Sequence, residues 1–428
     1  MDIFKHFRLK NTLLLRPEYN ATKSCGDLQV DNVFTINKVN LTYFNGMRRK
    51  SLIPSVLTNK PHRNRHAYVW FSSLLFLLLT CFAAGVRAQT LVTTYSQLAT
   101  AIASSDASIV IDGSGGPISA TTRIVIGYTV TITGINNAIL DGGNATQIFR
   151  IVSGGNVTIE DVTFQNGNGF DGSSPDDGGA IVNAAGGIIT LNRCTFKDNA
   201  TIDGRYGGAL SNYTGATMTV NNCTFTGNVA TGYPGGQWPH GGAINNYQGT
   251  LIVNNCEFSN NSATYLGHGG AIANNDGGVG TNATITVNNC KFANNTAYFG
   301  GAVCSRVSSS NMNLSVISNS LFTGNQATYG AVIMCAEGGA PDNFKIVNCT
   351  ITKDNIADAN GNVFAYWWHN GTPGIPTSTD PKFINCIIEE APGGNWFFDY
   401  DPLSGATKDN VRFSNCLSEY MAADMGAT

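Results

Sequence analysis

The sequence predicts an all-β fold, a β-solenoid of about ten stacked coils behind a short N-terminal helical cap. Two repeated elements and their spacing predict it. The first element is Gly-Gly-Ala followed by an aliphatic residue, at 178–181, 207–210, 241–244, 269–272, 300–303 and, in degraded form, 329–332. The second is Asn-Cys-x-Phe, clearest at 222–225, 255–258 and 289–292. A period of about 30 residues over most of the chain is typical of stacked units rather than of a compact domain.

One coil is expected to contain three short strands joined by corners. In the segment 284–292, Ile285 and Val287 alternate with threonines, which predicts a strand with one buried face. The apolar phase shifts by one residue at the asparagine pair that follows, so that Cys290 and Phe292 alternate next. Asparagine tolerates the left-handed backbone of a sharp bend, so this pair predicts a corner. The next glycine pair predicts another bend and a third strand.

Alignment of the coils predicts three columns of equivalent residues. The column at the cysteine position contains Ile135, Val162, Cys194, Cys223, Cys256, Cys290, Ser320, Cys349, Cys386 and Cys416. The column three residues earlier is apolar throughout and contains Ile132, Ile159, Leu191, Val220, Val253, Val287, Ile317, Ile346, Phe383 and Phe413. The residue before the cysteine position is asparagine in seven consecutive coils, at Asn222, Asn255, Asn289, Asn319, Asn348, Asn385 and Asn415. Stacked amides can hydrogen-bond along the solenoid, and the apolar columns are expected to fill its narrow interior.

Four regions are expected along the chain. Residues 1–66 are a basic N-terminal extension, either disordered or the product of a misassigned start. Residues 67–88 are predicted to be a signal peptide, because an apolar stretch ends in small residues just before Gln89; a retained membrane anchor is the alternative. Residues 89–120 are the N-terminal cap, with Thr94 as the N-cap of a helix and 108–111 as a strand. The repeats occupy 121–428, and no C-terminal cap is recognisable.

The charge of the exported part disfavours two classes of partner. The first 88 residues hold 13 of the 25 Lys and Arg and 4 of the 28 Asp and Glu. This leaves 12 basic against 24 acidic residues, a net charge of −12. An acidic surface is poorly suited to nucleic acid or to anionic membranes. The expected location is extracellular, either secreted or at the cell outer-membrane surface.

Seven of the 11 cysteines fall into the cysteine column. Reduced, buried thiols that pack as small apolar groups are one interpretation. Disulfides between some adjacent coils are the other, although side chains stacked in register hold their Cβ atoms farther apart than a relaxed bridge prefers. A zinc site is not expected, because a straight row cannot surround a tetrahedral ion.

A second motif, Phe-x-x-Asn, accompanies the glycine element at 196–199, 225–228, 258–261, 292–295 and 322–325. This pairing resembles the repeats of bacterial polymorphic outer-membrane proteins. Over about 120–420 the chain is similar to right-handed parallel β-helix proteins of the pectin-lyase-like superfold. The resemblance implies a right-handed parallel β-helix in a surface or secreted protein, often an adhesive one.

A cation or substrate site is predicted in the glycine-rich loop before the first Gly-Gly-Ala element. Asp171, Asp176 and Asp177 lie in this loop, and Asp203 and Arg205 follow one repeat later. Carboxylates bind Ca²⁺, and a basic residue can remove a proton, as a calcium-assisted lyase requires. Solvated loop acids are the alternative interpretation. No cofactor other than calcium is considered, no catalytic residue is assigned, and the metal ligands stay open.

The tripeptide at 267–269 resembles a catalytic Gly-His-Gly motif of polygalacturonases, which share the superfold. The coil alignment, however, places His268 at the position that holds Tyr206, His240 and Phe299 in other coils. We therefore interpret His268 as a member of an aromatic column. A metal-binding or pH-sensitive pair with His240 is the alternative.

Aromatic residues gather near the C-terminal end of the chain. Trp367, Trp368, Trp396 and Tyr400 are candidates for contact with carbohydrate, since flat rings suit sugars. Packing of long loops against the solenoid is the alternative.

The favoured function is that of an exported bacterial surface or secreted β-helix protein, non-catalytic, with an adhesive or structural role. Its expected partners are carbohydrate or a host or cell-surface ligand and another surface or anchoring component, with no nucleic acid. The first alternative is an enzyme, a polysaccharide lyase or glycoside hydrolase of the pectin-lyase-like superfold. The second is a carbohydrate-binding module.

Overall fold

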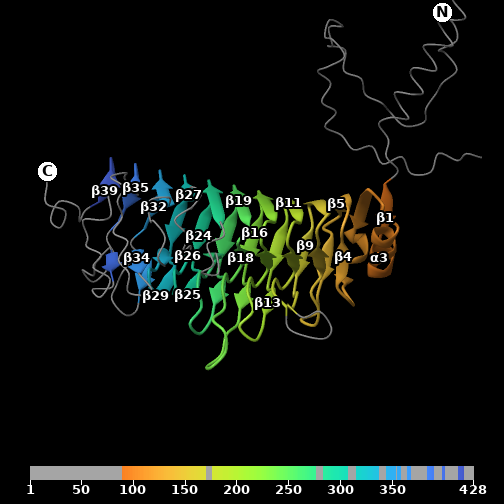
Figure 1. Ribbon diagram of the computed structural model, residues 1–428. Coiled ribbons are helices and arrows are strands. Elements are labelled where there is room, and N and C mark those ends of the chain that lie inside the picture. The colour runs from red at the N-terminus through yellow and green to blue at the C-terminus, as the bar shows by residue number, and fades with distance from the viewer. Residues whose placement is uncertain are drawn as a thin grey trace, which may run out of the picture. The chain divides into compact units, whose positions relative to one another are not determined.

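The structure is a computed structural model, and it describes residues 89–169, 176–275, 283–306, 315–336, 344–352, 354–357, 364–367, 383–389, 398–400 and 413–418. All of them belong to one compact unit, Ala83–Thr428. Within it the chain winds into a parallel β-solenoid, in which four parallel sheets run along the solenoid axis (Figure 1). The predicted fold class is confirmed.

The two longest sheets, called sheets A and B here, meet at the asparagine corner. Sheet A has 12 strands in the order β1 (Thr90–Val92), β2 (Ser108–Asp112), β5 (Thr129–Ile135), β8 (Asn156–Glu160), β11 (Ile188–Asn192), β15 (Thr217–Asn221), β19 (Thr250–Asn254), β23 (Thr284–Asn288), β27 (Ser315–Ser318), β31 (Phe344–Val347), β35 (Phe383–Ile384) and β38 (Phe413–Ser414). Sheet B has 11 strands in the order β3 (Ile118–Ser119), β6 (Ile139–Asp141), β9 (Thr163–Gln165), β12 (Thr195–Lys197), β16 (Thr224–Thr226), β20 (Glu257–Ser259), β24 (Lys291–Ala293), β28 (Leu321–Thr323), β32 (Thr350–Ile351), β36 (Ile387–Ile388) and β39 (Leu417–Ser418).

The other two sheets, C and D, complete the coil. Sheet C has ten strands in the order β4 (Ile124–Ile126), β7 (Phe149–Ile151), β10 (Ile181–Asn183), β14 (Leu210–Asn212), β18 (Ile244–Tyr247), β22 (Ile272–Asn275), β26 (Val303–Arg306), β30 (Ile333–Ala336), β34 (Phe364–Trp367) and β37 (Phe398–Tyr400). Sheet D has six strands in the order β13 (Ala200–Thr201), β17 (Val229–Ala230), β21 (Ser262–Ala263), β25 (Thr296–Phe299), β29 (Gln326–Tyr329) and β33 (Ile356–Ala357). Along one coil the chain passes through A, B, D and C before it returns to A.

The coils differ from the prediction in number and in strand content. Three strands per coil and about ten equal coils were expected, but among the described residues six coils carry a fourth strand, in sheet D, while the other sheets have ten to twelve strands. The strands of sheet D are only two to four residues long. A strand of two residues cannot show the apolar alternation from which strands are predicted.

A helix follows β1 near the start of the described part of the chain. α3 spans Tyr95–Ala103, and the Thr94 side chain accepts a hydrogen bond from the Gln97 backbone N–H, which makes Thr94 the predicted N-cap. Tyr95, Leu98, Ala101 and Ile102 are buried on one face of this helix. Next to it, β2 pairs in parallel with β1 and β5.

The apolar column of sheet A keeps its predicted register, since each member from Ile132 to Phe413 pairs with the next. The first member of the cysteine column was assigned wrongly. Ile135 is 37% exposed, whereas Ala138 is 1% exposed and accepts the Thr163 backbone N–H, the same bond that Val162 receives from Thr195. Ala138 follows Ile132 by six residues, whereas Val162 follows Ile159 by three, and these three extra residues displace the column in this coil.

The interior contains a row of stacked phenylalanines in sheet B. Consecutive rings from Phe164 to Phe322 lie nearly parallel, with centroids 4.7–5.1 Å apart. These side chains are fully buried. The seven cysteines of the cysteine column are free and are buried or half-buried, which agrees with the interpretation as reduced packing groups.

The two glycines of each Gly-Gly-Ala element have different roles. Gly241 has φ of 71°, in the left-handed region. Gly242 has no room for a side chain, because a Cβ there would lie 2.1 Å from the Gly270 carbonyl oxygen in the next coil. The degraded copy is one residue out of the predicted register, since Gly300 aligns with Gly330 and Val303 pairs with Ile333.

Within the described part of the chain, no helix has the length and apolar character that crossing a membrane would require.

Candidate functional site

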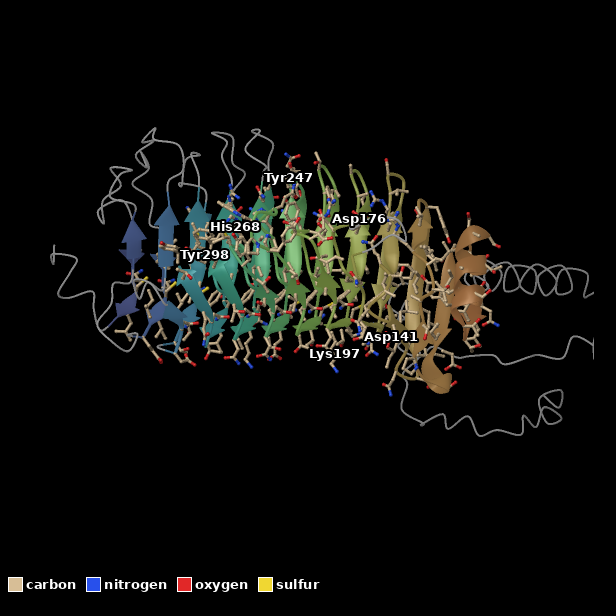
Figure 2. The ribbon with its side chains drawn as sticks, turned by 90° about the horizontal axis from the view of Figure 1, so that it is seen from below. Asp141, Asp176, Lys197, Tyr247, His268 and Tyr298 are labelled. Carbon is tan, nitrogen blue, oxygen red and sulfur yellow. The ribbon has the colours of Figure 1, made fainter. Side chains whose placement is uncertain are left out.

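The acidic residues before β10 form an ion-pair and hydrogen-bond cluster on the edge of sheet C. One carboxylate oxygen of Asp176 lies 2.7 Å from guanidinium nitrogens of both Arg123 and Arg150. All three side chains are partly exposed. In Figure 2, Asp176 lies on the same side of the solenoid as Tyr247 and His268, opposite Asp141 and Lys197. The sequence predicted a loop acid here, but not its two arginine partners.

Asp177 is only 2% exposed. It accepts hydrogen bonds from the Tyr206 backbone N–H, at 2.8 Å, and from the Tyr213 hydroxyl. Burial raises the pKa of Asp177 to about 6, although the hydrogen bonds from Tyr213 and Tyr206 act in the opposite direction. Burial and the charge of Asp177 in turn raise the pKa of Tyr213. Asp177 is therefore a buried acid whose ionised form is disfavoured.

Substitution of Asp177 by asparagine is expected to remove a pH-dependent part of the stability. Because the folded pKa is raised, protonated Asp177 contributes stability that is present below pH 4 and is lost as pH rises through about 6. With 1.36 kcal/mol per unit, Asp177→Asn should gain about 2 kcal/mol over the wild type between pH 4.5 and 7.5. Urea unfolding at both pH values measures this gain. The exposed Asp203→Asn is the control, and its stability should follow that of the wild type at both pH values. If Asp177→Asn differed from the wild type by the same free energy of unfolding at both pH values, that result would contradict the burial argument.

The other predicted members of this site are distributed differently. Arg205 is half-buried, and its charge is near enough to lower the pKa of Asp177. Asp203 is exposed on the turn before it. Asp171 lies outside the described residues. The structure thus brings together Asp176, Asp177 and Arg205.

The predicted aromatic site falls largely outside the described residues. Trp368 and Trp396 belong to segments that are not described. The backbone of Trp367 ends β34 and pairs with Ala336, whereas Tyr400 ends β37 and pairs with Tyr366. Trp367 and Tyr400 are therefore one residue out of register in sheet C.

His268 belongs to an aromatic column, as the coil alignment predicted. Its ring centroid lies 4.6 Å from that of His240 and 4.8 Å from that of Phe299, and Tyr206 stacks on His240 at 4.7 Å. Burial, and to a lesser degree Arg306, lowers the pKa of His240 to about 3, and burial also lowers the pKa of His268. A lowered pKa disfavours the charged form of both imidazoles, so the structure gives no support to the pH-sensitive alternative.

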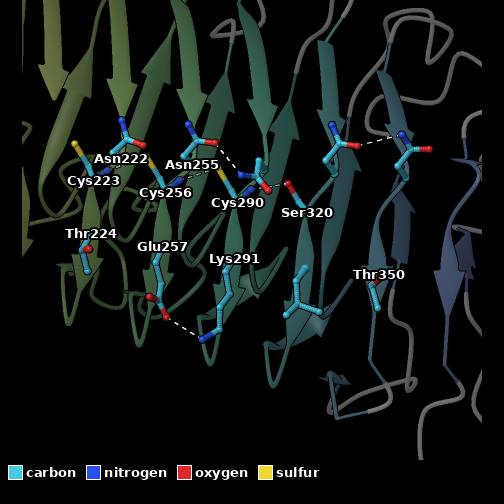
Figure 3. A pocket seen from close by; sticks show the side chains of 14 residues that line it. Asn222, Cys223, Thr224, Asn255, Cys256, Glu257, Cys290, Lys291, Ser320 and Thr350 are labelled. Carbon is cyan, nitrogen blue, oxygen red and sulfur yellow. Dashed lines mark hydrogen bonds and ion pairs between the residues drawn. The ribbon is translucent and has the colours of Figure 1, made fainter. Parts of the chain in front are cut away.

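The asparagine corner between sheets A and B forms an open groove of about 530 Å³ (Figure 3). Exposed amides along it bond to one another, for example Asn289 Nδ2 to Asn255 Oδ1 at 2.8 Å and Asn385 Nδ2 to Asn348 Oδ1 at 3.2 Å. The predicted amide row is therefore present at these steps. All seven asparagines have φ between 52° and 55°, as the predicted corner requires. Because its side chains bond to one another, we interpret this groove as a structural corner.

A second hollow, of about 340 Å³, lies beside the aromatic column. Its lining residues are Tyr206, Gly236, Gln237, Trp238, His240 and Arg306. Sequence reasoning missed it, although one signal was present. The segment 231–239 between β17 and β18 contains Tyr233 and Trp238 and lengthens one coil.

A metal centre receives no support from the side chains that the structure describes, among which no three His, Cys, Asp or Glu residues cluster. The calcium expectation therefore stays a prediction, because Asp171 lies outside that part of the chain.

The comparisons with known proteins support the repeat. Residues 255–275 match the model of the Chlamydia polymorphic membrane protein repeat. This segment runs from the asparagine corner through the Phe-x-x-Asn motif to the end of β22, and so includes both predicted elements. No curated protein and no solved structure matches the chain. The chain is a parallel β-helix protein that carries a repeat of the polymorphic membrane protein type.

Proposed function

We propose that this chain is an exported, surface-exposed β-helix protein that holds a carbohydrate or cell-surface ligand without catalysing a reaction on it. The repeat at 255–275 is of a kind named for membrane proteins, which supports a place at a cell surface. Residues 67–88 would direct export, and a separate anchoring component would retain the protein there. Long parallel solenoids offer extended surfaces for binding.

The ion pairs and hydrogen bonds of Asp176 and Asp177 are the observation that supports a non-catalytic function. An acid/base carboxylate must reach a proton of its substrate. Asp176 is instead held by two arginines, and Asp177 is buried beneath Tyr206 and Tyr213. These bonds join residues in or next to β4, β7, β10 and β14, which are four consecutive strands of sheet C. We infer that the pair joins successive coils.

Incubation of the purified protein with acidic and neutral polysaccharides, with and without calcium, tests the proposal. The expected result is retention of protein on at least one polysaccharide, with no release of reducing or unsaturated ends. Protease treatment of intact cells, followed by detection of the solenoid, tests its surface exposure. Release of sugar ends by the protein, or protection of the solenoid from protease in intact cells, would contradict the proposal. A requirement for calcium in retention would place a cation in the binding step.

A polysaccharide lyase or glycoside hydrolase is the second candidate. One observation favours it: burial raises the pKa of Asp177 to about 6, and shifted carboxyl groups are common in active sites. The same incubation with Asp177→Asn separates the two. Activity in the wild type that disappears in this variant would support the enzyme, with Asp203→Asn as the control.

A further inference from the structure

The hollow beside Trp238 lies where a loop departs from the repeat. The loop 231–239 leaves sheet D after β17 and returns at His240, whose backbone carbonyl accepts the Gly207 N–H at 2.7 Å. The Pro239 carbonyl accepts the His268 N–H at 2.9 Å, so the end of the loop is fixed to the next coil. Figure 1 shows loops projecting on the side of the solenoid where β13 lies. The hollow therefore has a wall anchored on two coils.

One exposed aromatic side chain, that of Trp238, lines this hollow. Trp238 is 41% exposed, and its ring contacts His268 edge-on with centroids 5.7 Å apart. Tyr233 in the same loop and Tyr265 one coil later are also exposed. Large exposed aromatics gathered at one site indicate a binding surface more often than single exposed apolar residues do.

Polar groups of three kinds line the same space. His240 is 4% exposed, and its Nδ1 has no hydrogen-bond partner among the described residues, although buried polar atoms are almost always paired. The Arg306 guanidinium lies 3.3 Å from His268 Nδ1 and supplies positive charge. Gln237 adds an amide that can both donate and accept.

We propose that this hollow binds a sugar residue, with the apolar face of the ring on Trp238 and its hydroxyl groups toward His240, Gln237 and Arg306. The inference rests on the proposed function and names the ligand class and the site. Sugars combine an apolar ring face with hydroxyl groups that donate and accept, and this lining offers both kinds of contact. The volume, about 340 Å³, is at the small end of ligand pockets. It suits a short stretch of a glycan chain.

The charge of the lining decides which sugars are tested. Among the described residues, Arg306 is the one charged residue that lines the hollow, and no carboxylate does. Neutral and acidic sugars are therefore both compatible with it. The test uses cellohexaose, maltohexaose, xylohexaose and hexagalacturonate, with binding to the purified protein followed by tryptophan fluorescence and calorimetry.

At least one of the four oligosaccharides is expected to bind, and Trp238→Ala should weaken that binding by at least about 10-fold. His240→Phe should weaken it by about 10-fold, the effect of one lost hydrogen bond. His240→Phe keeps the stack, because Phe299 occupies the equivalent position two coils later, so urea unfolding should match the wild type. Ile188→Ala, an exposed apolar position on sheet A, is the control and should bind normally.

The outcomes separate this site from the proposed function. Failure of all four oligosaccharides to bind overturns the inference, and so does unchanged affinity in Trp238→Ala or His240→Phe. If the Trp238→Ala and His240→Phe variants are still retained on polysaccharide, that result contradicts binding at the hollow but not the proposed function. Release of sugar ends contradicts only the non-catalytic function, since binding at the hollow is measured independently.

Discussion

Replacement of Asn261 by alanine is expected to destabilise the solenoid by about 2–6 kcal/mol, because four buried groups each lose a hydrogen bond worth about 0.5–1.5 kcal/mol. The Asn261 Oδ1 accepts both the backbone N–H and the Nδ2 of Asn228, at 3.1 and 2.9 Å. Its Nδ2 donates to the Phe225 carbonyl and to Asn295 Oδ1, at 3.1 and 2.9 Å. Asn261 has no exposed surface, so water cannot replace these bonds. Urea unfolding followed by circular dichroism measures the loss.

The matched control is Asn255→Gly in the same coil. Asn255 is exposed and has φ of 55°, which glycine adopts without strain. Its amide bond to Asn289 faces solvent, so the variant should change stability by less than about 1 kcal/mol. Asn261 belongs to a ladder of buried asparagines that bond to one another along the solenoid. Equal losses in the two variants would mean that this buried ladder contributes no more stability than the exposed row.

This ladder illustrates what the sequence could not decide. Asparagines at the corner were predicted to bond along the stack, and some of them do, at the surface. The fully buried row is formed by the last residue of the Phe-x-x-Asn motif, at Asn199, Asn228, Asn261, Asn295 and Asn325, and it continues to Asn355, which lies outside the motif. Buried and exposed rows have the same residue type and the same period. Only the direction of the corner, which depends on the short strands of sheet D, distinguishes them.

The fold was predictable because apolar columns hold a strict register over many coils. The predicted helix begins with a side chain that matches its N-cap, which is local information. The displaced first coil was not predictable, because Ile135 stands three residues after Ile132, the spacing between the two columns in the other coils, although it is exposed. The pattern of apolar residues alone does not show whether an apolar residue near the end of a strand points into the solenoid or lies on its outer face.

The sequence identified the acidic residues of this site but did not show which residues bond to their carboxylates. Arg123 and Arg150 precede Asp176 by 53 and 26 residues, and only coil stacking brings them to the same carboxylate. The hollow beside Trp238 depends in the same way on residues from separate coils. Tyr206 precedes β14, His240 precedes β18 and Arg306 ends β26, and they meet there because these strands lie within three steps of one another in sheet C. Interruptions of the repeat marked such places in the sequence, without showing what they contact.

Substitution of Phe258 by alanine is expected to cost about 4 kcal/mol, since a large buried ring is removed from a closely packed interior. The ring stacks between Phe225 and Phe292 at 4.7 and 4.9 Å, so the cavity would separate two coils that support each other. Phe258→Leu should cost less than about 1.5 kcal/mol, because Leu140 and Ile351 fill equivalent positions elsewhere in sheet B. Urea unfolding compares both with Ile252→Ala, a half-buried position in the same coil. Because each coil contacts only its neighbours, the alanine variant should lose protection from amide exchange first in β16, β20 and β24. A uniform loss along the solenoid would show instead that all coils unfold as one unit.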